Sequence, residues 1–268
     1  MGVNKMTLIK KELKSQWKIM LVFMLVLTMY SAIIIAMYDP QLGESLHMMK
    51  EAMPQLFAAF GMSDPGLTLL DFLTNYLYGF IFIVFPFLYV IIMCYRLMCR
   101  YIDKGSMAYL LATPHSRLSI VLSQYIVLIL GITFLITYTT VFIELCSKLM
   151  YGENIPIASF IRLNLGLLSL HIFLGSMCYL TACCFDEMKY SLGIGAGLGI
   201  FFILLQMLSN VHEKIEFLKY LTPLTLFHAQ GLIAFDLSAI FFLLVFIFMS
   251  FVMLFITCII FRKRDLSL

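Results

Sequence analysis

Charged residues are scarce in this chain: Asp, Glu, Lys and Arg make up 12% of its 268 residues, whereas hydrophobic residues make up 62%. The mean hydropathy is +1.00. A soluble fold of this length has no interior large enough to hide so much apolar surface. The composition therefore excludes a soluble globular protein. It predicts an integral membrane protein with one domain over residues 1–268, which has room for about six spans of roughly 20 residues each.

Sequence motifs for chemistry are also missing. No phosphate-binding loop of the pattern G-x-x-x-x-G-K-[ST] occurs, so the chain is not expected to hydrolyse ATP. The seven cysteines form no C-x-x-C pair and have no histidine at metal-ligand spacing, which indicates packing residues rather than a redox or metal site. The hydrolase patterns H-E-x-x-H and G-x-S-x-G do not occur. We therefore expect no enzyme activity, no cofactor bound by this chain and no nucleic-acid partner.

Long apolar runs predict an all-α, polytopic membrane protein. In front of the first run, Met6, Ile9, Leu13 and Trp17 follow one another at three- and four-residue steps among lysines. This pattern predicts an interfacial helix over residues 1–18, with Trp17 in the aromatic belt at the membrane surface. The predicted transmembrane helices cover about residues 19–37, 77–94, 118–143, 163–184, 192–208 and 237–261.

Basic residues gather on one side of these predicted spans. Thirteen of the eighteen Lys and Arg residues lie in the N-terminal segment, in residues 96–117, in the turn at 185–190 and in the C-terminal tail. The positive-inside rule places such segments in the cytosol. We therefore expect a multi-pass protein of the cell membrane with both termini cytoplasmic. The expected location is a bacterial plasma membrane.

The two segments assigned to the outer side contain helix breakers. The first, residues 38–75, has Pro54 inside a short amphipathic stretch. The second, residues 211–235, has apolar pieces that are broken at Pro223 and are too short to span a membrane. In the first we expect a short helix, interrupted at Pro54, on the outer surface. In the second we expect a re-entrant or surface pair of helical turns.

A polar segment, residues 99–124, connects the second and third predicted spans. Ser106 can cap a short helix that Pro114 ends, because the residue before a proline avoids the helical conformation. Met107, Leu110 and Leu111 would share one face of this helix, at spacings of three and four residues. So short a helix is marginal alone in water. Its apolar ridge is therefore expected to lie on the lipid interface or on another protein.

The order of an acid, a glycine, a short helix with paired leucines and then Thr-Pro-x-Ser-Arg resembles the cytosolic loop of type-2 ABC exporter permeases. The resemblance implies a coupling helix within residues 99–117 that docks into a separate ATPase subunit, which uses ATP and Mg. It also implies a dimer of permease chains that exports a drug, an antimicrobial peptide or an ion. Asp103 departs from the glutamate that is commoner in the family, and this shorter acid is suited to capping a helix. The matching residues are Asp103, Gly105, Leu110, Leu111, Thr113, Pro114, Ser116 and Arg117, and Met107 completes the ridge.

Two polar residues form a candidate site at membrane depth. Glu144 is placed at the end of the third predicted span and His171 near the middle of the fourth. A proton or ion relay through them would characterise an ion-coupled secondary transporter, because polar groups in a span usually have a function. Alternatively, His171 forms a hydrogen bond to a neighbouring helix and Glu144 faces outer water. A membrane sensor or assembly subunit that transports nothing is a third reading.

Small residues mark one face of the fifth predicted span. Gly193, Gly195, Gly197 and Gly199 form two overlapping small-x-x-x-small pairs. Such pairs allow another helix to approach closely within a membrane. We expect these glycines to be helix-packing positions.

Overall fold

The computed structural model describes residues 2–38, 48, 50–62, 68–107, 116–152, 155–185, 187–211 and 213–263. Its regular elements are all helical and the described residues contain no strand, which confirms the predicted class. Six helices are long and apolar enough to cross a membrane, as predicted. They are α1 (Gly2–Met37), the helix from α5 to α6 (Ile81–Asp103), α8 (Arg117–Tyr151), α9 (Ile157–Cys184), α10 (Met188–Val211) and α12 (Leu237–Lys263).

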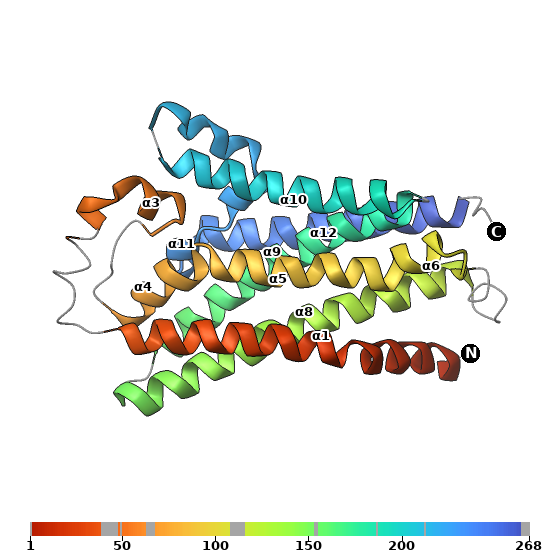
Figure 1. The fold of residues 1–268 in the computed structure, drawn as a ribbon, viewed down its shortest axis with the longest axis horizontal. Helices are drawn as coiled ribbons and strands as arrows, with labels where there is room; N and C mark the ends of the chain where they lie inside the picture. The colour runs from red at the N-terminus through yellow and green to blue at the C-terminus, as the bar shows by residue number, and fades with distance from the viewer. Residues whose placement is uncertain are drawn as a thin grey trace.

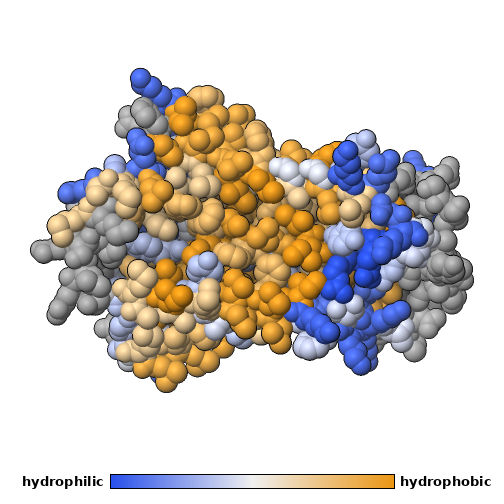
Figure 2. Space-filling model, viewed as in Figure 1, coloured by the Kyte–Doolittle hydropathy of each residue, from blue (hydrophilic) through white to orange (hydrophobic). Residues whose placement is uncertain are grey.

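These long helices run along a common direction, so that the bundle has two distinct ends (Figure 1). The beginning of α1, the end of α12 and the short helix α6 (Arg100–Asp103) lie together at one end. Figure 2 shows a broad band of hydrophobic residues around the middle, and hydrophilic residues concentrated toward that end. The band matches what a bilayer requires, and an even number of spans brings the two termini to the same side.

The first helix, α1, includes both the predicted interfacial segment and the predicted first span without a break at residue 18. No proline and no further glycine follows Gly2 before its end, so nothing in the sequence interrupts the helix. One side of the N-terminal half packs on the bundle through Ile9 and the buried Glu12 and Gln16. Leu13 and Trp17 are exposed on another side.

The second span extends well beyond residue 94, its predicted end. It continues as a helix to Asp103 because no glycine or proline occurs between residue 94 and Gly105. Its start lies at Ile81 rather than at residue 77, since the chain is interrupted at Gly79 and Phe80. The segments in order are α4 (Leu69–Leu73), the π-helical η1 (Thr74–Tyr78), α5 (Ile81–Cys94), the π-helical η2 (Tyr95–Cys99) and α6.

Short helical segments cover the opposite end of the bundle. The segment α3 (Pro54–Ala59) begins at the proline that was predicted to break this stretch. A Cβ atom at Gly79 would lie 2.6 Å from the carbonyl oxygen of Phe60, so glycine lets the chain after α3 approach the start of α5. The region before the last span was expected to form a pair of helical turns, and it forms three short segments: η3 (Glu213–Leu221), η4 (Pro223–Leu226) and α11 (Ala229–Ile233).

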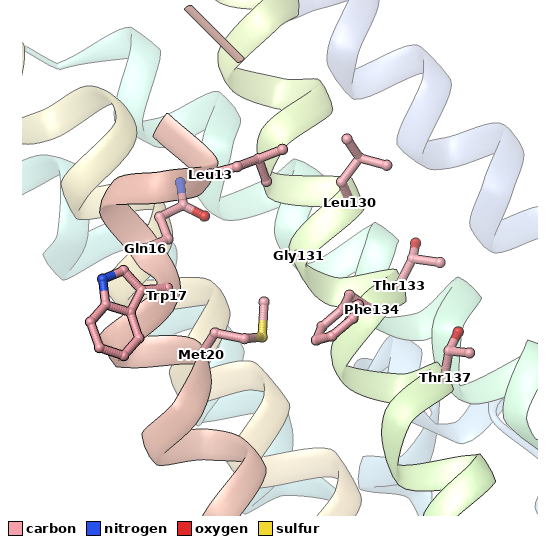
Figure 3. A pocket seen from close by; sticks show the side chains of 9 residues that line it. All are labelled: Leu13, Gln16, Trp17, Met20, Leu130, Gly131, Thr133, Phe134 and Thr137. Carbon is pink, nitrogen blue, oxygen red and sulfur yellow. The ribbon is translucent and has the colours of Figure 1, made fainter. Parts of the chain in front are cut away.

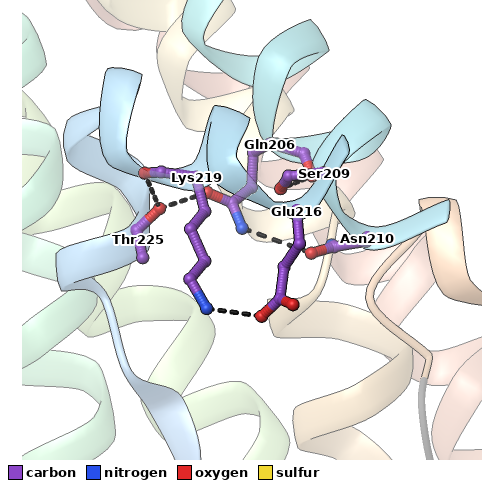
Figure 4. Close-up of polar contacts among 6 residues, drawn as sticks. All are labelled: Gln206, Ser209, Asn210, Glu216, Lys219 and Thr225. Atoms are coloured by element: carbon purple, nitrogen blue, oxygen red, sulfur yellow. Dashed lines mark hydrogen bonds and ion pairs between the residues drawn. The ribbon is translucent and has the colours of Figure 1, made fainter. Parts of the chain in front are cut away.

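A polar network joins these segments to the end of α10 (Figure 4). The Thr225 hydroxyl donates to Gln206 Oε1 at 2.9 Å and, in an alternative orientation, to the Lys219 carbonyl oxygen at 2.6 Å. Gln206 Nε2 lies 3.4 Å from Asn210 Oδ1, and Lys219 forms an ion pair with Glu216. The network therefore fixes η3 and η4 against the last turns of α10.

Candidate functional site

The first residue of the predicted motif within the coupling segment is Asp103, the last residue of α6. The Asp103 carboxylate oxygen Oδ1 accepts a hydrogen bond from the backbone N–H of Met188 at 3.3 Å, and Met188 is the first residue of α10. A carboxylate at this position satisfies an amide that has no partner within its helix and faces the positive end of the helix dipole. Among the described residues, the helix that Asp103 caps is α10.

The next two residues turn the chain away from α6. Gly105 has φ +65°, a left-handed conformation that favours glycine, and its N–H donates to the Ile102 carbonyl oxygen at 3.0 Å. The Ser106 hydroxyl donates to the Tyr101 carbonyl oxygen at 3.3 Å. Both contacts close the C-terminal end of α6.

Met107 is the one member of the predicted ridge that falls within the described residues. Its side chain is 2% exposed and belongs to the main hydrophobic core of this chain. Leu110, Leu111, Thr113 and Pro114 lie outside the described residues. The coupling role of this segment stays a prediction, and Met107 has the position of an anchor between the segment and the bundle.

The predicted motif ends where α8 begins. The Ser116 hydroxyl accepts a hydrogen bond from the Ser119 backbone N–H at 3.2 Å, so Ser116 is the N-cap of α8 and Arg117 is its first residue. Arg117 is half-buried. Both ends of the segment are therefore attached to helices that cross the apolar band.

Contacts between α1 and the end of the second span were not anticipated from the sequence. The Tyr101 hydroxyl donates to Glu12 Oε1 at 2.7 Å, and Glu12 is 4% exposed. Arg96 Nη2 donates to the backbone and hydroxyl oxygens of Ser15, both at 3.1 Å. One signal was available, because Glu12 is the only acidic residue among the first 18. A lone acid on a lysine-rich helix indicates a specific partner, but its spacing does not identify Tyr101.

The four glycines of α10 divide into two pairs. A Cβ atom on Gly195 would lie 2.3 Å from Thr181 Oγ1 of α9, and one on Gly199 would lie 2.1 Å from the ring of Phe87 in α5. No atom lies within 4 Å of a Cβ built on Gly193 or Gly197. Gly195 and Gly199 are thus the positions at which α10 approaches its neighbours within this chain.

The structure does not bring the two candidate polar membrane residues together. His171 is fully buried, with Nδ1 2.8 Å from the Leu167 carbonyl oxygen and Nε2 3.2 Å from the Ile83 carbonyl oxygen of α5. Glu144 lies inside α8 rather than at its end, because no glycine or proline occurs between Glu144 and Gly152. Its Oε2 atom has no partner among the described residues. No hydrogen bond or ion pair between Glu144 and His171 occurs in the described part of the chain. The contacts of His171 are those of a residue that joins two helices.

Ionisable groups outside the spans have structural contacts. Asp236 precedes α12 and accepts hydrogen bonds from the Ser238 backbone N–H at 3.1 Å and hydroxyl at 2.8 Å. These bonds lower the pKa of Asp236, because they stabilise the ionised carboxylate. Within the described ranges, no group of three or more His, Cys, Asp or Glu side chains is arranged to hold a metal ion.

The fold defines a multi-pass helical membrane protein, in which the beginning of α1, the end of α12, α6 and the beginning of α8 lie at one end of the bundle. The sequence model of the ABC-2 family transporter proteins matches residues 6–266. Because this match covers nearly the whole chain, the protein belongs to the ABC-2 family and is a transporter permease, the membrane subunit. No curated protein matches the chain.

Proposed function

We propose that this permease is the membrane subunit of an ATP-driven exporter and moves its substrate with the help of a separate ATPase subunit. The observation that carries the proposal is family membership over residues 6–266. The sequence supports it, since the chain has no phosphate-binding loop of its own. ATP and Mg would therefore be used by the partner.

The ATPase would dock on the segment over residues 99–117, at the end of the bundle that carries both termini. Three described contacts support this assignment, because they offer a route from the segment to the spans. Met107 packs into the core, Asp103 is bonded to the start of α10, and Tyr101 is bonded to Glu12 of α1. A nucleotide-driven movement of the segment would then bias the bundle between an inward-facing and an outward-facing state.

The remaining parts of the proposal follow from the family. Two permease chains, identical or different, would work with two ATPase subunits, and transport would be outward across a bacterial plasma membrane with the termini in the cytosol. The excess of Lys and Arg at the end of the bundle that holds the termini supports this orientation. A drug, an antimicrobial peptide or an ion is the proposed class of cargo.

Replacing Leu110→Asp and Leu111→Asp together tests the docking segment. Charge on an apolar docking ridge should lower co-purification of an ATPase subunit by about tenfold or more, which corresponds to about 1.4 kcal/mol of binding free energy. The matched control is Leu221→Asp, since Leu221 is 59% exposed at the opposite end of the bundle. The measurement is the ratio of ATPase subunit to permease, and the ATPase activity, in purified membranes that contain equal amounts of each variant.

Unchanged association in the double variant would contradict docking at this segment. The energy source is tested separately, by following export in cells depleted of ATP while the proton gradient is clamped. Export that persists under those conditions would contradict an ATP-driven mechanism and favour ion-coupled transport.

A further inference from the structure

A pocket of about 540 Å³ lies between α1 and α8 (Figure 3). This volume falls in the range of about 300–1,000 Å³ that is typical of small-molecule clefts. Its apolar lining includes Leu13, Trp17 and Met20 of α1 and Phe134 of α8. Trp17 and Phe134 are 56% and 54% exposed, so the pocket opens onto the surface that faces lipid.

One polar side chain in the wall has no partner. Gln16 is 3% exposed, and neither its amide oxygen nor its amide nitrogen forms a hydrogen bond within the described residues. Figure 3 shows the Gln16 side chain on the part of α1 that is next to α8. Thr133 and Thr137 of α8 also line the pocket and carry hydroxyl groups. A buried amide without a partner is unfavourable. The pocket therefore fits a ligand that is largely apolar but carries a neutral hydrogen-bonding group.

Two positively charged residues of α1 lie close to the pocket. Lys10 precedes Leu13 by three residues and Lys14 precedes Trp17 by three residues, and both lysines are exposed. Residues three apart on a helix lie on the same side. The two ammonium groups therefore lie near the pocket, each about one turn closer to the N-terminus than Leu13 or Trp17. None of the pocket-lining residues is charged. A matching ligand has an apolar chain, then a neutral polar linkage, then an anionic group.

We propose that this pocket binds an anionic diacyl phospholipid from the leaflet on the N-terminal side of the membrane. An acyl chain lies between α1 and α8, an ester carbonyl accepts a hydrogen bond from the Gln16 amide, and the phosphate lies near Lys10 and Lys14. Trp17 is placed at the level where an aromatic side chain marks the membrane interface, which is also the level of the ester groups. This lipid site is independent of the cargo and of the ATPase partner.

Trp17 provides a direct probe, because it lines the pocket and is the only tryptophan in the chain. The full-length protein is reconstituted into phosphatidylcholine vesicles that contain either brominated phosphatidylglycerol or brominated phosphatidylcholine. Bromine on an acyl chain quenches tryptophan fluorescence at contact, so quenching reports which lipid occupies the pocket. We expect the anionic lipid to be preferred by about fivefold or more, from its attraction to the nearby lysines.

Three variants distinguish lipid binding in the pocket from general attraction of anionic lipid to the protein surface. Lys10→Ala should lower the preference several-fold. Lys11→Ala is the comparison, because Lys11 is also exposed but is turned about 100° around α1 from Lys10 and away from Leu13 and Trp17, and it should lower the preference less. Thr137→Phe should fill the pocket from the exposed face of α8 and abolish the preference although every lysine remains.

Several results would overturn the site. Equal quenching by the two lipids in the unaltered protein would show that the pocket does not select an anionic lipid. Equal losses in Lys10→Ala and Lys11→Ala, or a preference that survives Thr137→Phe, would show surface attraction alone. Quenching by neither lipid would show that another protein surface, such as a second copy of the chain, covers Trp17.

Discussion

The helices α9 and α12 pack against each other but have opposite relations to the protein interior. In α9, 56% of the most apolar stretch is buried and its mean hydropathy is 1.7, whereas in α12 only 17% is buried and the mean hydropathy is 3.0. The more apolar helix is the less buried one. The reason is that lipid chains are as apolar as leucine side chains, so hydrophobicity does not drive a helix into a bundle within a membrane.

The polar groups of the two helices show which interactions position a membrane helix when hydrophobicity does not. In α9, Asn164 accepts a hydrogen bond from the Tyr78 hydroxyl at 2.9 Å, and the Ser176 hydroxyl lies 2.7 Å from that of Tyr125. In α12, the Ser250 and Thr257 hydroxyls donate only to carbonyl oxygens of their own helix. Contacts between helices therefore hold α9 in a defined position, and α12 relies more on packing along one side.

The largest effect on stability should come from a substitution at a closely packed position of α10. This helix has one face packed on neighbouring helices and one face in open space. Gly199→Leu would force a side chain into the buried ring of Phe87 and should destabilise the protein by about 3 kcal/mol. Gly197→Leu, two residues away in open space, is the control and should change stability by less than about 0.5 kcal/mol. Thermal unfolding of both variants in detergent measures the difference. Equal melting temperatures of the two variants would contradict the assignment of a packed face and an open face to α10.

A smaller effect is expected at the hydrogen bond between α9 and η1. Asn164→Leu leaves the buried Tyr78 hydroxyl without its partner and should cost about 1–2 kcal/mol of stability. Adding Tyr78→Phe removes the unpaired hydroxyl, so the double variant should recover most of that loss. Denaturant unfolding of the two single variants and the double variant measures the coupling. Additive losses would mean that the bond does not contribute to the position of α9.

The smallest effect should occur on the lipid face of α12. Phe248 is 66% exposed, and Phe248→Leu should change stability by less than about 0.5 kcal/mol. Thermal unfolding in detergent is again the measurement, with Phe246→Leu, at the 2% exposed Phe246 of the same helix, as the destabilising control. A large loss at Phe248 would contradict the lipid-facing assignment and indicate that another chain covers this surface.

The sequence predicted the class, the six spans and the family, since each depends on features within a short stretch. Apolar runs locate spans, and the pattern from Asp103 to Arg117 is readable as a motif. The contacts of this region were not predictable in the same way. Asp103 meets Met188, and Tyr101 meets Glu12, across separations of 85 and 89 residues. No local pattern encodes which distant helix an acidic side chain will reach.

Composition and the order of residues fixed how many helices cross the membrane, where glycine and proline interrupt them, and which segments carry positive charge. The folded arrangement selected among positions that look alike in the sequence: Gly195 and Gly199 pack on neighbours while Gly193 and Gly197 do not, and Met107 lies in the core of its own chain. The physical reason is that lipid and protein interior are both apolar. A membrane helix therefore has no polar face to mark the side exposed to lipid. Only the shapes and hydrogen bonds of adjacent helices determine which side is covered by protein.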